Sequence, residues 1–219
     1  MLLDTLEIDP PGPPGASVIW MHGLGADAHD FYGIPPELGL PADLNVRYVF
    51  PNAPRMPVTI NQGWVMPAWY DIRGFGPRDQ DETGIRASAE RIGQLIGHEV
   101  ERGVPERRIV LAGFSQGGAM ALFTGLRHPA ALAGVMCLSG YLVLHETLEA
   151  ELSEANRAVP VFQGHGTDDP MVPVRLAHGT RDLLTSTGYQ VEYHEYQMPH
   201  TVCGEEVRDI GAWLARVLA

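Results

Sequence analysis

Short apolar runs alternate along this chain with longer segments of helical spacing, and this alternation restricts the fold more than any other feature. Most of the runs show little polar alternation, which is typical of strands buried on both faces of a parallel sheet. They cover 16–21, 46–50, 109–112, 134–138, 159–163 and 190–196. The helical segments cover 82–102, 116–127, 174–187 and 205–218. The pattern predicts an α/β fold with a mostly parallel central sheet and helices on both faces.

The remaining segments add little to this plan. Residues 2–8 alternate weakly, as an additional edge strand would, and 9–15 contain four prolines and two glycines, which predict a loop. No repeat, long linker or large lid insertion interrupts the pattern. We therefore expect one domain over residues 1–219, which buries about 70% of the surface that the unfolded chain exposes.

Charge and cysteine content narrow the classes of function. The formal net charge is -12, and all 15 basic residues are arginine. An acidic surface repels phosphate backbones and anionic lipids, so we expect neither nucleic acid nor acidic membranes as partners. No apolar stretch is long enough to span a membrane, and the first residues do not resemble a signal peptide. Cys137 and Cys203 are too few for a disulfide scaffold or a cysteine zinc site, so we expect a cytoplasmic protein without a metal or organic cofactor.

The most informative motif is Gly-Phe-Ser-Gln-Gly at 113–117, between the apolar run 109–112 and a helical segment. In a G-x-S-x-G turn from strand to helix, the sharp turn exposes the serine hydroxyl, and the helix N-terminus faces the oxygen that becomes charged during acyl transfer. Ser115 is therefore a candidate nucleophile. The alternative is that Ser115 only caps the helix that follows.

A serine nucleophile needs a histidine to accept its proton and a carboxylate to orient that histidine. Four histidines lie downstream: His165, His178, His194 and His200. The first precedes the candidate acids, the second falls in a helical pattern and the third in a strand pattern. His200 lies in the loop between the last strand and the last helix, where a base can reach over the sheet edge, although it could also be an ordinary surface or capping histidine.

The candidate acids and the oxyanion hole follow from other strand ends. Asp168 and Asp169 both follow the run 159–163, and spacing alone does not choose between them, because either can instead cap the next helix. The sequence His22-Gly-Leu24-Gly follows the first buried run, so the amides of Leu24 and Gln116 are the expected oxyanion donors. His22 itself is better explained as a packed, hydrogen-bonded residue.

These motifs resemble, along nearly the whole chain, the phospholipase/carboxylesterase family of small α/β-hydrolases, which includes acyl-protein thioesterases. The shared segments are 22–27 (HGLGAD), 51–54 (PNAP), 69–72 (WYDI), 113–118 (GFSQGG), 138–142 (LSGYL), 165–173 (HGTDDPMVP) and His200. The resemblance implies that Asp169 is the acid, because the family's aspartate lies three residues before a valine, here Val172. It also implies that Leu24 and Gln116 form the oxyanion hole.

The resemblance further implies a substrate pocket that includes Trp69, Tyr141 and Val172. Without the family, the aromatic segment 61–70 is a loop in which Trp64 is better explained by core packing and Trp69 equally well by core packing or by lining a site. The family tends to have proline where this chain has Val143. Bacterial members often form dimers, which implies a homodimer.

The expected activity is hydrolysis of short- to medium-chain carboxylic esters by Ser115, His200 and Asp169 through an acyl-enzyme. The absence of a large apolar lid insertion favours small soluble esters. Two alternatives remain: a thioesterase or lysophospholipase that acts on long acyl chains, and an inactive hydrolase fold that serves as a binding module.

Overall fold

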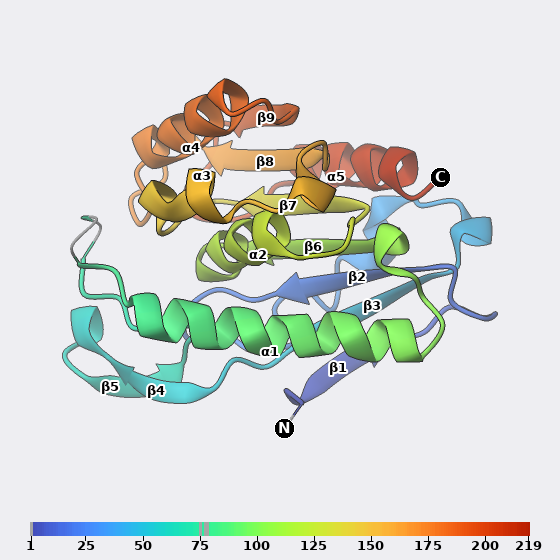
Figure 1. The fold of residues 1–219 in the computed structure, drawn as a ribbon, viewed down its shortest axis with the longest axis horizontal. Coiled ribbons are helices and arrows are strands. Elements are labelled where there is room, and N and C mark those ends of the chain that lie inside the picture. The colour runs from blue at the N-terminus through green and yellow to red at the C-terminus, as the bar shows by residue number, and fades with distance from the viewer. Residues whose placement is uncertain (1, 75, 77–78) are drawn as a thin grey trace.

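A seven-stranded sheet forms the centre of the computed structural model, which describes residues 2–74, 76 and 79–219 (Figure 1). Across the sheet the strands are β1 (Thr5–Ile8), β3 (Val46–Pro51), β2 (Ala16–Met21), β6 (Ile109–Phe114), β7 (Gly134–Leu138), β8 (Val161–Gly166) and β9 (Val191–Tyr196). Strand β1 pairs antiparallel with β3, and the other pairs are parallel. This arrangement confirms the predicted fold class.

Helices cover both faces of the sheet because the strands are apolar on both faces. The helices are α1 (Glu82–Glu101), α2 (Gln116–Arg127), α3 (Leu148–Glu151), α4 (Val174–Ser186) and α5 (Gly204–Val217). Figure 1 shows α1 and α2 in front of the sheet and α5 behind it. Two separate apolar clusters result, and consecutive residues of β2 alternate between them: Ile19 belongs to one, Trp20 to the other.

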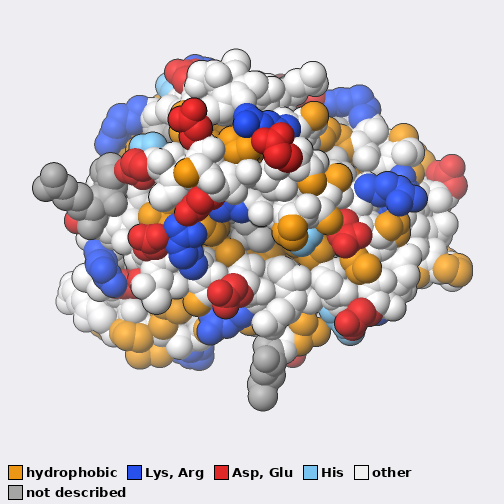
Figure 2. All heavy atoms as spheres, viewed as in Figure 1, with side chains coloured by type: hydrophobic (Ala, Val, Ile, Leu, Met, Phe, Trp, Pro, Cys, Tyr) orange, Lys and Arg blue, Asp and Glu red, His pale blue; other side chains and the backbone are white. Residues whose placement is uncertain are grey.

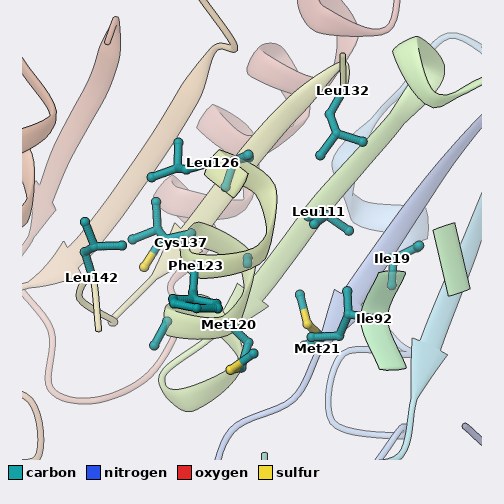
Figure 3. Packing of buried hydrophobic residues seen from close by; sticks show 14 of the residues in the cluster. Ile19, Met21, Ile92, Leu111, Met120, Phe123, Leu126, Leu132, Cys137 and Leu142 are labelled. Atoms are coloured by element: carbon teal, nitrogen blue, oxygen red, sulfur yellow. The ribbon is translucent and has the colours of Figure 1, made fainter. Parts of the chain in front are cut away.

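The cluster on the α1 and α2 face is drawn in Figure 3. Met120 and Phe123 of α2 pack there with strand residues such as Leu111, and Ile92 of α1 lies near Met21. Helix α2 is buried along almost its whole length. It therefore forms a rigid support for the residue that precedes it, Ser115.

The segment 61–70 is not a continuous loop as predicted. Strand β4 (Arg55–Val58) pairs antiparallel with β5 (Trp64–Pro67) in a separate two-stranded sheet. Each strand contains a proline and has only four residues, so its sequence lacks the β-branched alternation that indicates a strand. The positive φ angles of Gln62 and Gly63 close the turn.

The neighbouring parallel strands β2, β6, β7, β8 and β9 end at the same edge of the sheet. The loops that follow them contain Leu24, Ser115, Tyr141, Asp169 and His200, respectively. In open α/β sheets the carboxyl ends of the strands are where ligands bind. The topology therefore brings the predicted site residues to one edge.

Candidate active site

Ser115 occupies a tight turn between β6 and α2. Its φ of 54° and ψ of -116° are unusual for a residue with a side chain, and its amide donates a hydrogen bond of 2.7 Å to the carbonyl of Leu138. The Ser115 side chain makes no capping hydrogen bond to α2. The helix-capping alternative for this serine is therefore not what the structure shows.

The glycines on either side of Ser115 allow this turn. A Cβ atom at Gly113 would collide with the backbone of Gly117, and a Cβ at Gly117 would collide with the carbonyl of Met21. The start of α2 therefore packs directly against the end of β2, which brings the amide of Gln116 towards the loop that contains Leu24.

His200 and Asp169 are in direct contact. Nδ1 of His200 lies 2.6 Å from Oδ2 of Asp169, whose side chain is fully buried. The other carboxylate oxygen, Oδ1, accepts hydrogen bonds of 2.8 Å from the amides of Met171 and Val172. Asp168, the alternative that spacing left open, is exposed. A proton on Nδ1 leaves Nε2 of His200 as the nitrogen that can accept a proton.

His165 has a position that the sequence analysis did not anticipate, because it precedes the acid in the chain. The side chain is fully buried, and its Nε2 lies 2.9 Å from the carbonyl of Val172 and 3.5 Å from Oδ2 of Asp169. Burial lowers the pKa of His165, so a neutral ring that donates from Nε2 fits this site. His165 therefore holds the turn whose amides bind Asp169.

The loop after β2 is held in place by hydrogen bonds of His22 and Trp69. Nδ1 of His22 lies 2.7 Å from the carbonyl of Gly23, and Nε2 accepts a hydrogen bond of 3.1 Å from the amide of Ala53. The indole of Trp69 donates to the carbonyl of His22, 2.9 Å away. Burial lowers the pKa of His22, in agreement with a neutral, packed histidine.

The side chain of Gln116 connects the turn at Ser115 to the aromatic segment 61–70. Its Oε1 accepts from the amide of Trp69 at 2.8 Å, and its Nε2 donates to the carbonyl of Tyr70 at 2.7 Å. The described residues supply no hydrogen-bond acceptor for the backbone amides of Gln116 and Leu24. Neither amide is therefore engaged by the described residues.

A cavity of about 430 Å³ lies over the serine and contains the predicted residues Leu24, Ser115, Gln116, Tyr141, Val172 and His200 in its lining. Trp69 is not in the lining; it is fully buried beneath the loop after β2, and its neighbour Tyr70 lines the cavity instead. The other lining residues are Gly23, Ala26, Asp30, Ile60, Asn61, Ile72, Phe114 and Met171. Most of this surface is apolar, as is usual for sites that bind small molecules.

The rim of the cavity exposes large apolar side chains. Met171 is 62% exposed and Ile60 46%. Trp64 is 73% exposed on β5, so it does not pack in the core as the sequence suggested. In Figure 2 hydrophobic side chains gather at the lower left, where Figure 1 places β4 and β5.

Within the described part of the chain, no group of three or more His, Cys, Asp or Glu side chains is arranged to hold a metal ion. Among those residues, no helix is both long and apolar enough to cross a bilayer.

The central sheet is mostly parallel, Ser115 lies in a strained turn after β6, and a histidine after β9 is bound to a buried aspartate after β8. Together these features define a serine ester hydrolase of the α/β-hydrolase fold. A comparison with family models agrees: the phospholipase/carboxylesterase model matches residues 5–218. The chain belongs to this family.

Individual relatives span almost the whole chain. Acyl-protein thioesterase 1 of Cryptococcus neoformans is 36% identical, with 99% of this chain and 98% of the relative covered. Acyl-protein thioesterase 1 of Neurospora crassa is 41% identical over 93% of this chain and 87% of its own length. The crystal structure of Zea mays acyl-protein thioesterase 2 superposes with a TM-score of 0.86 at 26% identity, covering 99% of both chains.

Proposed function

We propose that the protein is a serine thioesterase and esterase that removes long acyl chains from thiol and hydroxyl groups. Ser115 is the nucleophile, His200 the general base and Asp169 the carboxylate that orients the base. The observation that carries this proposal is the shared cavity of Ser115 and His200, together with the 2.6 Å contact between His200 and Asp169.

In the proposed cycle Nε2 of His200 takes the proton of Ser115 while Oγ attacks the acyl carbon. The amides of Leu24 and Gln116 stabilise the oxyanion. The bond to the leaving group breaks, and the thiol or alcohol departs with the proton from His200. Water, deprotonated by the same histidine, then attacks the acyl-enzyme, and the carboxylic acid leaves as Ser115 regains its proton.

The preference for long acyl chains replaces the short- to medium-chain reading made from the sequence. The relatives named acyl-protein thioesterase support it, since they are 36–41% identical over 93–99% of this chain. The apolar cavity and the exposed Ile60 and Met171 at its rim support it as well, because an alkyl chain gains free energy by covering such surface.

The test compares kcat/KM for p-nitrophenyl butyrate, p-nitrophenyl palmitate and a palmitoyl thioester of a cysteine peptide. We expect the palmitoyl substrates to be preferred and the thioester to be hydrolysed. A butyrate preference of tenfold or more would restore the short-chain carboxylesterase as the better description.

The residue roles are tested with substitutions on the best of these substrates. Ser115→Ala and Asp169→Asn are each expected to lose about 10⁴-fold in kcat. Asp168→Asn is the matched control, because it makes the same chemical change one residue away on an exposed side chain, and it should keep most of the activity. If Asp168→Asn and Asp169→Asn lose activity equally, the assignment of the acid is wrong.

A further inference from the structure

Trp69 is fully buried and takes no part in the proposed reaction cycle. The family resemblance implied a place in the substrate pocket, but Trp69 lies outside the cavity lining. Its backbone amide donates to Oε1 of Gln116, and its indole donates to the carbonyl of His22. Gln116 provides one of the two proposed oxyanion amides, and His22 begins the loop that provides the other, Leu24. Trp69 therefore connects the two segments from which the oxyanion hole is built.

The backbone around Trp69 is attached to the two helices that cover this face of the sheet. The hydroxyl of Ser88, on α1, donates to the carbonyl of Trp69. Gln116, the first residue of α2, binds the amide of Trp69 and the carbonyl of Tyr70 with the two ends of its side-chain amide. The indole of Trp69 is therefore held from α1 and α2 before it reaches the loop after β2.

The hydrogen bonds of His22 determine which of its ring nitrogens carries the proton. Nε2 lies 3.1 Å from the amide of Ala53, and a backbone amide can only donate, so Nε2 is the acceptor. Burial lowers the pKa of His22, which favours the neutral ring. The proton is then on Nδ1, 2.7 Å from the carbonyl of Gly23. His22 therefore donates to that carbonyl.

Fixing the carbonyl of Gly23 also fixes the amide of Leu24. The two groups belong to one trans peptide unit, which is planar, so they point in opposite directions. The amide of Ala26 donates to the same Gly23 carbonyl at 3.3 Å. A Cβ atom at Gly23 would lie only 3.5 Å from the Cβ of Ser115, so this peptide unit is next to the nucleophile. The N–H of Leu24 therefore has a set direction beside Ser115.

We propose that Trp69 and His22 are positioning residues that hold the amides of Leu24 and Gln116 in a fixed relative orientation. The proposal rests on the proposed function, because it requires that these amides stabilise the oxyanion formed at Ser115. Preorganisation is what makes such donors effective, since a donor that is already oriented costs no reorganisation when charge develops. Trp69 thus serves the site without touching the substrate.

The first test is Trp69→Phe, which removes the indole N–H and keeps an aromatic ring. We expect kcat to fall about tenfold with KM almost unchanged, because the oxyanion is absent from the bound substrate. Trp213→Phe is the matched control: Trp213 is also buried, at 2% exposed, but it belongs to the apolar cluster on the other face of the sheet. It should keep kcat. Thermal unfolding of both variants separates a loss of stability from a loss of rate.

A second pair of variants separates the two contacts of His22. In His22→Asn the side-chain amide takes the place of Nδ1 and keeps a donor for the carbonyl of Gly23. In His22→Gln it takes the place of Nε2 and keeps only the contact with Ala53. We expect His22→Asn to retain kcat within about fivefold and His22→Gln to lose on the order of 10²-fold. Equal losses in the two variants would contradict the orienting role of His22.

Inhibitor binding provides a readout that overall stability does not affect. The carbonyl carbon of an alkyl trifluoromethyl ketone accepts Oγ of Ser115, whose proton passes to His200, and the carbonyl oxygen becomes an oxyanion. The corresponding carbinol has the same shape and forms no such adduct. Trp69→Phe and His22→Gln should weaken ketone binding about tenfold or more and change carbinol binding less than about twofold.

Two results would refute the proposal. One is an equal loss of ketone and carbinol affinity in Trp69→Phe, and the other is an equal loss of kcat in Trp69→Phe and Trp213→Phe. The proposed function is tested separately by Ser115→Ala. If Ser115→Ala binds the ketone as tightly as wild type, the proposed nucleophile is wrong and this inference fails with it. Ketone binding that depends on Ser115 but not on Trp69 or His22 refutes this inference alone.

Discussion

Ser115 adopts backbone angles that usually require glycine. A residue with a side chain in such a sparsely populated region costs about 1–3 kcal/mol, and the surrounding structure has to enforce it. Here the hydrogen bond from the Ser115 amide to Leu138 and the close packing of Gly117 against Met21 hold the turn. The turn that places Ser115 in the cavity lining therefore comes at a cost in folding stability.

The strain at this residue predicts a difference between two inactive variants. Ser115→Gly relieves the strain, whereas Ser115→Ala keeps it and removes only the hydroxyl. Allowing for the greater flexibility of glycine in the unfolded chain, we expect Ser115→Gly to be more stable than Ser115→Ala by about 1 kcal/mol in urea unfolding. Equal stability of the two variants would show that the elbow is not strained.

Among single residues, the sequence predicted those that belong to a local motif better than it predicted contacts between side chains. The turn at Ser115 depends on five consecutive residues, 113–117. His200 was predicted from its position after the last strand. Spacing did not separate Asp168 from Asp169, because their different burial depends on how β8 and β9 pack. The contact between His165 and the turn of Asp169 depends on the path of the chain after β8, which the sequence does not display.

Helix α5 contains a buried carboxyl group that the proposed reaction does not use. Both carboxylate oxygens of Glu206 lack a hydrogen-bond partner among the described residues, and the side chain lies against Gly164 of β8. Burial, together with repulsion from Asp209, raises the pKa of Glu206 to about 8. The group is therefore protonated in the folded protein at neutral pH and ionised in the unfolded chain.

This difference in protonation between the folded and unfolded states makes the folding stability depend on pH. Between the unfolded pKa, about 4.5, and the folded pKa, about 8, the folded state binds more protons than the unfolded state, so stability falls as pH rises. We expect Glu206→Gln to be more stable than wild type at pH 8, by an amount on the order of a few kcal/mol, and close to wild type at pH 5. Thermal or urea unfolding at both pH values measures this.

The control for this prediction is Glu205→Gln, which changes the neighbouring, exposed residue of the same helical turn. It should shift stability little at either pH. A stability gain of Glu206→Gln that is equal at pH 5 and pH 8 would contradict the raised pKa of Glu206.

Elements were predicted well where apolar patterns are long and poorly where they are short. The order of the major strands and helices follows from the sequence, and their ends differ by one or a few residues; β8, for example, begins after Pro160 and continues to Gly166. The β4–β5 hairpin was missed because two prolines interrupt two four-residue strands. Trp64 and Val65 of the hairpin are exposed, so the apolar residues of β5 do not mark a buried face.

The molecule as a whole has a formal net charge of -12, and the mouth of the cavity that contains Ser115 is acidic as well. Asp30 is exposed in that lining, and none of the described lining residues is an arginine. A negative potential at the entrance disfavours anionic substrates at low ionic strength, and salt screens it over roughly 10 Å at 0.1 M. The sequence predicted the sign of this field but not its position at the site.

Removing the charge of Asp30 tests this field. At low salt we expect Asp30→Asn to raise kcat/KM about threefold for a p-nitrophenyl ester that carries a free carboxylate and to leave p-nitrophenyl butyrate unchanged. Asp27→Asn removes the same charge from the same loop, outside the lining, and should have a smaller effect. The prediction fails if the two variants respond alike or if 0.5 M salt does not abolish the gain.

The four tryptophans, all within the described residues, differ sharply in exposure. Trp20, Trp69 and Trp213 are buried, at 1%, 0% and 2% exposed, whereas Trp64 is 73% exposed on the hairpin next to the cavity over Ser115. A water-soluble collisional quencher such as acrylamide therefore reaches one indole and spares three. The protein contains its own optical reporter: protection of Trp64 from quenching would signal that an amphiphile has covered the hairpin, with the buried indoles as an internal reference.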